Sequence, residues 1–184
     1  NTASDTTKTQ NVTYEGSLKL AMILVPPGSF QRDYKAGNIS VITKAFLMSQ
    51  YEITREQFTI IMEADPSAVQ YSTSTKDPVQ SVNWYHAIAF CNKLSVKDGL
   101  TPVYSVPGID FKNLTYNDIP DNYNTKSIWN STEANWSANG YRLPTEMEWM
   151  WAAMGTPADG QNGGVNTTGY FKAFAGSTQT KSIG

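Results

Sequence analysis

The sequence is poor in the side chains on which most catalytic centres and metal sites depend. Its 184 residues include one cysteine, Cys91, and one histidine, His86. A single cysteine excludes an intrachain disulfide and a cysteine-rich zinc site. A single histidine excludes histidine-rich metal sites and most histidine-based catalytic triads. These counts exclude, within this chain, centres that need a cysteine pair, a histidine pair or a cysteine–histidine dyad.

The sequence also lacks a strong excess of charge and any long apolar run. Its formal net charge is −2 and it has no basic run, so we do not expect nucleic acid as a partner. The longest apolar run, residues 20–27, is far shorter than the roughly 20 residues that span a bilayer, so no membrane span is predicted. With 40% hydrophobic and 12% aromatic residues, the composition is typical of a globular domain with a sizeable core.

The first residues of the chain are polar. Residues 1–10 (NTASDTTKTQ) contain no hydrophobic region of a signal peptide. We interpret residues 1–17 as a flexible leader, such as the spacer that remains after a signal is removed, with a truncation remnant as the alternative. Residues 18–184 are predicted to form one domain. The leader indicates an exported protein, cell-surface or extracellular, either free or lipid-anchored through a removed N-terminal segment.

Two helices are predicted in the first hundred residues. Residues 54–57 (TREQ) match a capping box ahead of a short amphipathic helix, which we expect to stop at residues 65–66 (DP). Asn83 is the expected N-cap of a second helix over residues 84–95, because apolar residues recur there at spacings of three and four.

A third helix is predicted after residue 144. Thr145 and Glu148 form a second capping box, and Gly155 is expected to end the helix. The predicted apolar face consists of Trp149, Ala152 and Ala153.

Short strands account for much of the remaining chain. Residues 22–25 and 29–32 are predicted to be partner strands across a Pro-Pro-Gly turn. Residues 39–48 carry β-branched and aromatic residues and are predicted to be one strand, ending near Tyr51. Residues 100–140 are expected to form a long ordered loop with short strands at 103–106 and 127–129.

Four segments, in order, resemble signature blocks of the formylglycine-generating-enzyme (sulfatase-modifying-factor) family. They are residues 22–30 (MILVPPGSF), 46–58 (FLMSQYEITREQF), 78–92 (PVQSVNWYHAIAFCN) and 140–153 (GYRLPTEMEWMWAA). The resemblance implies an α+β, C-type-lectin-like fold with short twisted antiparallel strands, two to three helices and much ordered loop. It also implies further C-terminal blocks that this sequence does not contain, so the domain is expected to lack its C-terminal part.

The resemblance carries implications for chemistry as well. Enzymes of this family oxidise a substrate cysteine with oxygen, using two cysteines that bind copper, and those cysteines would lie in the C-terminal part. Cys91 is not one of them. Met150 and Met154 stand where the family commonly has Glu and Arg, and we expect both at the surface.

The candidate site residues have structural interpretations. Cys91 is expected to be a small buried hydrophobic residue, and His86 a surface or hydrogen-bonded residue rather than a ligand. We do not expect an acid/base pair among the candidate carboxylates, which are Glu133, Glu146 and Glu148. We do not expect an EF-hand loop in the aspartate-rich turn, which contains Asp118, Asp121, Asn122 and Asn124. Aromatic residues of the long loop are expected to be core anchors or an exposed binding surface: Tyr104, Phe111, Tyr116, Tyr123, Trp129 and Trp136. We assign no catalytic residue, metal ligand or cofactor, and the ligand-binding residues stay unassigned.

Two functions follow from these observations. The first is a non-catalytic, surface-displayed binding protein of receptor type, since the sequence also resembles the variable proteins of diversity-generating retroelements. The resemblance implies a protein or other surface ligand and diversification in the C-terminal part. The alternative is a copper-dependent formylglycine-generating oxidase that acts on a sulfatase cysteine. The single cysteine favours the first.

Overall fold

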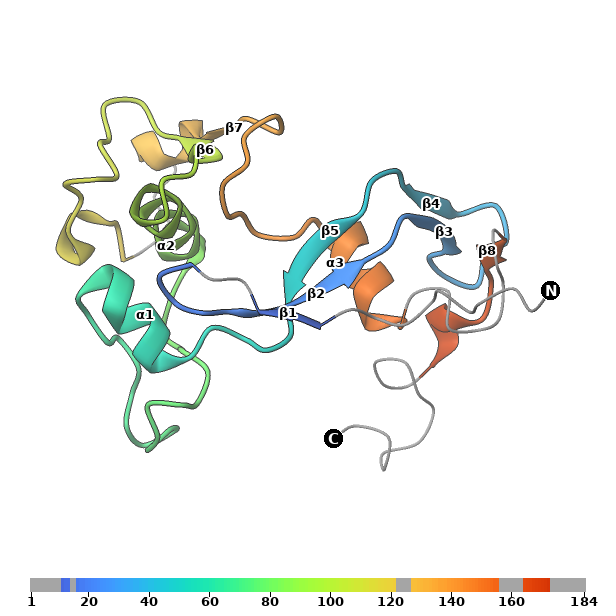
Figure 1. Cartoon of the computed structure of the whole chain (residues 1–184), viewed down its shortest axis with the longest axis horizontal. Coiled ribbons are helices and arrows are strands. Elements are labelled where there is room, and N and C mark those ends of the chain that lie inside the picture. Colours follow the sequence, from blue (N-terminus) through green and yellow to red (C-terminus); the bar gives the residue numbers. More distant parts are fainter. Residues whose placement is uncertain (1–10, 14–15, 122–126, 156–163, 173–184) are drawn as a thin grey trace. The chain divides into compact units, whose positions relative to one another are not determined.

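The computed structural model describes residues 11–13, 16–121, 127–155 and 164–172. These residues belong to two compact units, which are described separately below. The first unit takes its residues from 1–14, 21–50 and 144–184, and the second from 15–20 and 51–143. Short strands and three α-helices among the described residues confirm the α+β class (Figure 1). No helix in these ranges is long and apolar enough to cross a membrane.

The first unit contains two three-stranded sheets. One has the order β1 (Asn11–Thr13), β2 (Ala21–Val25), β5 (Phe46–Ser49), and all its pairs are antiparallel. The other has the order β4 (Ile39–Ile42), β3 (Gly28–Gln31), β8 (Val165–Asn166). In it, β3 and β4 are antiparallel, whereas β3 and β8 run parallel, with Ser29 opposite Val165.

This topology corrects two sequence predictions. The segments 22–25 and 29–32 are not partners, because β2 and β3 belong to different sheets. The carbonyl of Pro26 between them accepts a hydrogen bond from Trp151 Nε1 at 2.8 Å, instead of closing a hairpin. The segment 39–48 is likewise two strands, since residues 43–45 carry the chain from β4 in one sheet to β5 in the other.

The core of the first unit forms around α3 (Glu146–Ala153). Trp151 is fully buried and stacks on Phe30 with ring centroids 5.6 Å apart. Val25, Ile42 and Met154 complete the buried cluster, and Met150 packs against it partly buried. The predicted apolar face of this helix is therefore wrong in part, because Trp149 is exposed and Trp151 points inward, whereas Ala152 packs against the cluster as expected. The expectation that Met150 and Met154 lie at the surface is also wrong.

The second unit is built on two helices, α1 (Arg55–Met62) and α2 (Trp84–Lys97). The rings of Phe58 and Phe90 stack between them at 5.5 Å. Thr54 and Asn83 cap the two helices, each in a capping box, as predicted. However, α1 ends at Met62, and its C-cap Glu63 has a left-handed conformation (φ 58°), before the expected stop at 65–66.

The rest of the second unit is mostly loop with short regular pieces. These are β6 (Tyr104–Ser105), β7 (Glu133–Ala134) and the 3₁₀ turns η1 (Tyr116–Asp118) and η2 (Ile128–Ser131). Tyr104 pairs with Ala134 in an antiparallel ladder. The strand predicted at 127–129 is wrong, because Ile128 and Trp129 belong to η2 and the strand β7 follows it.

The predicted leader, residues 1–17, is described in part. Residues 11–13 form β1, and the Ser17 backbone N–H donates to Asp98 Oδ1 at 2.8 Å. Residues 1–10 and 14–15 lie outside the described ranges.

Candidate functional site

Cys91 has the environment of a core residue. It lies on the inner side of α2 and is buried. Burial raises the pKa of its thiol to about 12, far above neutral pH. Since the thiolate is the nucleophile and the metal ligand, Cys91 is unsuited to either role in the folded protein. This agrees with its interpretation as a small hydrophobic residue.

His86 is buried at the start of α2, and its two ring nitrogens differ. Nδ1 accepts a hydrogen bond from the Asn83 backbone N–H at 3.2 Å, which places the ring proton on Nε2. Nε2 has no hydrogen-bond partner among the described residues, and the nearest carboxylate oxygen, on Asp121, is 3.9 Å away. The ring stacks on Tyr116, with centroids 4.7 Å apart. The ring is therefore buried rather than at the surface, and among the described residues it is hydrogen-bonded at Nδ1 but not at Nε2.

The candidate carboxylates serve the backbone or stay exposed. Glu148 completes the capping box of α3, and Asp118 accepts from Thr115 at the start of η1. Asp121 is exposed, and Asn122 and Asn124 lie outside the described residues. No group of three potential metal ligands occurs within the ranges that the structure describes.

The second unit presents exposed aromatic rings close to a guanidinium group. We call Trp84, Tyr104, Trp136 and Arg142 the aromatic surface. Trp84 and Trp136 are 49% and 65% exposed, unusual values for tryptophan. Trp84 contacts Tyr104 edge-on, with centroids 6.5 Å apart, and the Arg142 guanidinium carbon lies 5.3 Å from the centre of Trp136. The Tyr104 hydroxyl accepts from the Leu143 backbone N–H at 3.1 Å, which links the two pairs.

Buried hydrogen bonds hold this surface in place. The side chain of Asn92, fully buried on α2, donates to the Tyr104 carbonyl at 2.6 Å and accepts from its N–H at 3.1 Å. Ser95, also buried on α2, accepts from the Tyr141 N–H at 2.8 Å, next to Arg142. Gly140 permits this approach, because an added Cβ would lie 2.6 Å from Ser95 Oγ. The aromatic residues are thus presented by a rigid frame.

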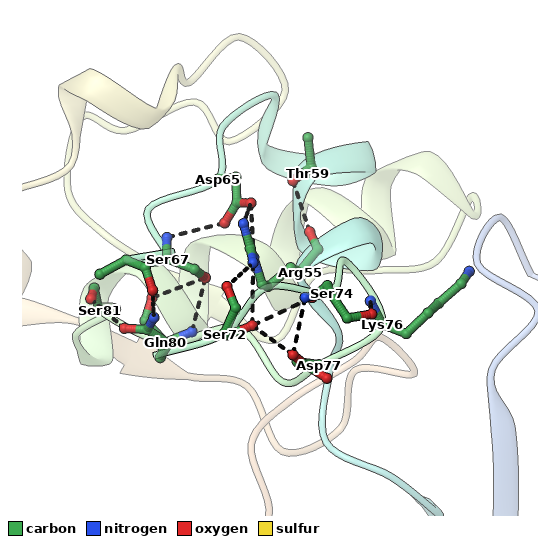
Figure 2. A network of polar contacts seen from close by, with 11 residues as sticks. Arg55, Thr59, Asp65, Ser67, Ser72, Ser74, Lys76, Asp77, Gln80 and Ser81 are labelled. Carbon is green, nitrogen blue, oxygen red and sulfur yellow. Dashed lines mark hydrogen bonds and ion pairs between the residues drawn. The ribbon is translucent and has the colours of Figure 1, made fainter. Parts of the chain in front are cut away.

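A separate polar network fixes the loop between α1 and α2 (Figure 2). The buried guanidinium of Arg55 donates twice to Asp65, at 3.0 and 2.7 Å, and to the Ser72 carbonyl at 2.6 Å. Ser72 donates in turn to Asp77 at 2.9 Å, and Ser67 accepts from the Gln80 N–H at 3.2 Å. The Arg55 hydrogen bond holds the pKa of the Asp65 carboxyl below its usual value. These hydrogen bonds join Arg55 to Asp65 and Ser72 of the loop and thereby hold it in place.

The sequence predicted part of the candidate site. The aromatic residues of the long loop were expected to be core anchors or an exposed surface, and the structure divides those that it describes between the two roles. Tyr123 lies outside the described residues. Trp129 and Phe111 are buried anchors that pack edge-on at 6.0 Å, whereas Trp136 is exposed. Asn92 and Arg55 were missed, because a polar residue within a helix pattern gives no local sign of a distant backbone partner.

Comparison with known proteins identifies the family of this chain. The chain belongs to the family of the sulfatase-modifying factor enzyme 1-like domain, whose model matches residues 8–179. Among solved structures, it is similar to Treponema denticola variable protein 1, with 30% identity and a TM-score of 0.68 over 96% of this chain and 63% of that one. The C-type-lectin-like fold expected from the sequence is thereby confirmed.

Two further proteins resemble the chain. Chaperone protein LppX of Paenibacillus barcinonensis is 36% identical over 135 residues, which cover 73% of this chain and 45% of that protein. CarF shares the fold, with 22% identity and a TM-score of 0.61 over 89% of this chain and 66% of that one. The chain thus spans less than half of the Paenibacillus protein and less than two thirds of the treponemal one.

The copper centre implied by the family does not fit the residues of this chain. That centre needs two thiolates, which are soft ligands suited to copper. The chain has one cysteine, and its thiol is buried with a raised pKa. This chain alone therefore does not supply the ligands of that centre.

Proposed function

We propose that this chain is a non-catalytic ligand-binding domain of receptor type and that the aromatic surface contacts its ligand. The observation that carries the proposal is the pair of exposed tryptophans, Trp84 and Trp136, on a hydrogen-bonded frame. A few hot-spot residues carry most of the binding energy in protein interfaces, and they are enriched in Trp, Tyr and Arg. Rings held rigidly before binding lose little conformational entropy when a ligand arrives.

The ligand class that fits this surface best is a protein. The composition of the surface supports this choice, because Trp, Tyr and Arg are all represented in four residues. The relative from Paenibacillus is named a chaperone, a class of protein that binds other polypeptides. The treponemal neighbour is named a variable protein, which is compatible with a scaffold that carries different binding residues.

A peptide-display selection tests the proposal. Peptides are selected on the wild-type protein and then measured against Trp136→Ala and, as a matched control, Trp149→Ala. Trp149 is 57% exposed but belongs to the first unit. We expect Trp136→Ala to weaken binding about 30-fold, which corresponds to a hot-spot loss of about 2 kcal/mol. Peptides that bind Trp136→Ala as well as wild type would contradict the assignment of the surface.

An oxidation assay tests the same proposal against the oxidase alternative. The family match favours this alternative, whereas the single buried cysteine opposes it. The protein is incubated with copper, oxygen and a sulfatase-derived cysteine peptide, and the peptide is analysed by mass spectrometry. We expect no conversion of the cysteine. Turnover would overturn the non-catalytic proposal.

Export and diversification are finer parts of the proposal. The polar leader supports an exported, surface-displayed protein, with or without a lipid anchor, and fractionation with protease treatment of intact cells tests this. Retroelement diversification predicts gene copies that differ at adenines in downstream codons, matched by a nearby template repeat.

A further inference from the structure

The chain has one histidine, and its position is unusual because the imidazole is part of a helix cap. In the capping box of α2, the His86 backbone N–H donates to Asn83 Oδ1 at 3.0 Å, and the Asn83 backbone N–H donates to His86 Nδ1 at 3.2 Å. Glu or Gln commonly fills this third helical position, because each offers an acceptor oxygen. An imidazole offers an acceptor only while Nδ1 is unprotonated.

The same cap holds a neighbouring loop. The Asn83 side-chain amide donates to the Pro120 carbonyl at 2.7 Å and to the Asp121 carbonyl at 3.0 Å. Tyr116, at the start of η1, stacks on the imidazole. The first residue of α2 is Trp84, a member of the aromatic surface. The cap formed by Asn83 and His86 therefore joins the loop 116–121 to the start of α2, where the exposed Trp84 lies.

Protonation would disrupt this arrangement in three ways. A proton on Nδ1 turns the acceptor into a donor that faces the Asn83 N–H, so one bond of the capping box is lost. The new positive charge lies within the first turn of α2, where the helix dipole disfavours cations. The charge is also buried, at a ring only 2% exposed.

Few charged groups near His86 could stabilise the protonated imidazole. Among the described residues, the titratable groups that face the imidazole are the Asp121 carboxylate and the Tyr116 phenol. Asp121 is exposed and 3.9 Å from Nε2, so water screens its attraction. The residue of α1 that packs here is Phe58, which contacts Tyr116 edge-on and carries no charge. Burial lowers the pKa of His86 below its usual value, and the Asp121 carboxylate opposes this shift without cancelling it.

We propose that His86 is a pH-sensitive switch: protonation of its ring opens the cap of α2, releases the loop 116–121 and thereby displaces Trp84 from the aromatic surface. Mild acid would thus weaken ligand binding. Only this last step rests on the proposed function. The opening of the cap is a property of the protein without ligand.

Two measurements on the ligand-free protein test the switch. The ¹³Cε1 signal of the single histidine reports its titration by NMR, and we expect a midpoint below 6.5. Hydrogen exchange of the His86 and Ala87 amides, corrected for intrinsic rates, reports opening of the cap. As the pH is lowered from about 7 to 5, we expect protection of these amides to fall by up to about tenfold per pH unit, until the pH reaches the titration midpoint of His86 in the folded protein. The paired carboxylates Asp65 and Asp98 titrate below this range, because their pKa values are lowered from 3.8.

The matched variant is His86→Gln, which keeps a neutral capping acceptor. In it, protection of the same amides should not depend on pH over this range. The switch is overturned if wild-type protection stays constant while the imidazole titrates, or if the midpoint lies at 6.5 or above. These wild-type results decide the matter even if the variant does not fold.

Binding of a selected peptide is measured last. Binding that weakens with acid in wild type but not in His86→Gln supports the regulatory step, and equal pH dependence in both proteins overturns it. Absence of any peptide that depends on Trp136 contradicts the proposed function alone, because the exchange experiment needs no ligand.

Discussion

Replacement of Arg55 by methionine should destabilise the second unit more than any change to a surface charge. Methionine retains much of the side-chain volume but has no donors. The variant loses two hydrogen bonds to Asp65 and two to Ser72, at 2.6 and 3.2 Å. Removal of one partner from a buried ion pair costs about 3–5 kcal/mol. We expect about 3 kcal/mol, the lower end, because the Asp65 side chain is 28% exposed and stays partly hydrated.

Urea unfolding followed by tryptophan fluorescence and circular dichroism measures this loss. The midpoint should fall at an unchanged slope, since the surface exposed on unfolding stays the same. Lys76→Met is the matched control, because Lys76 also pairs with a carboxylate, that of Glu56, but at the surface. We expect the control to change stability by less than about 0.5 kcal/mol. A loss below about 1 kcal/mol in Arg55→Met would refute the reasoning from the buried network.

The pH dependence gives a second check on this network. Arg55 lowers the pKa of Asp65 from 3.8 in the folded protein, so the pair adds stability above pH 3.8. This contribution should disappear as the pH falls from 3.8 through the lower folded pKa. In Arg55→Met, the same acid range should show a smaller change in the urea midpoint.

Two further predictions concern the cores of the two units. Gly28→Ala should lower stability by about 1–3 kcal/mol in a thermal melt, because the new Cβ would lie 2.9 Å from Trp151 Cη2. Gly37→Ala is the control and should leave the melting temperature unchanged, because no atom lies within 4 Å of its added Cβ. Native Cys91 should resist iodoacetamide at neutral pH and react only after unfolding in urea, because its thiol is buried with a pKa of about 12. Rapid labelling of the native thiol would contradict this account.

The helix starts could be predicted from sequence because their signals are local. Thr54 and Thr145 each form a capping box with a residue three positions later, and the structure contains both boxes. Asn83 was also predicted, but its partner in the box is His86, a residue type outside the usual pattern. The usual pattern therefore does not indicate the imidazole as a cap, although its spacing from Asn83 is the correct one.

The sheet partners could not be predicted because they depend on distant residues. The pairing of β3 with β8 joins Ser29 to Val165, and no local pattern around residue 29 indicates it. The choice of which face of α3 is buried also depends on distant residues. Trp149 and Trp151 are similar in sequence terms, and only packing on Phe30 decides that Trp151 is the buried one. The sequence indicated an exposed aromatic surface as one alternative. It did not indicate the supporting residues Asn92 and Ser95, because their hydrogen-bond partners are distant in sequence.

The first unit is discontinuous along the chain, which has a consequence for its folding in the cell. Residues 21–50 leave the ribosome before residues 51–143, which make up most of the second unit, and must wait for the segment after 144. At ordinary translation rates this delay lasts roughly 5 to 20 s. During it, β3 lacks β8, and the ring of Phe30 lacks Trp151. The nascent polypeptide thus exposes an unpaired strand edge and apolar side chains, the features that attract chaperones during biosynthesis.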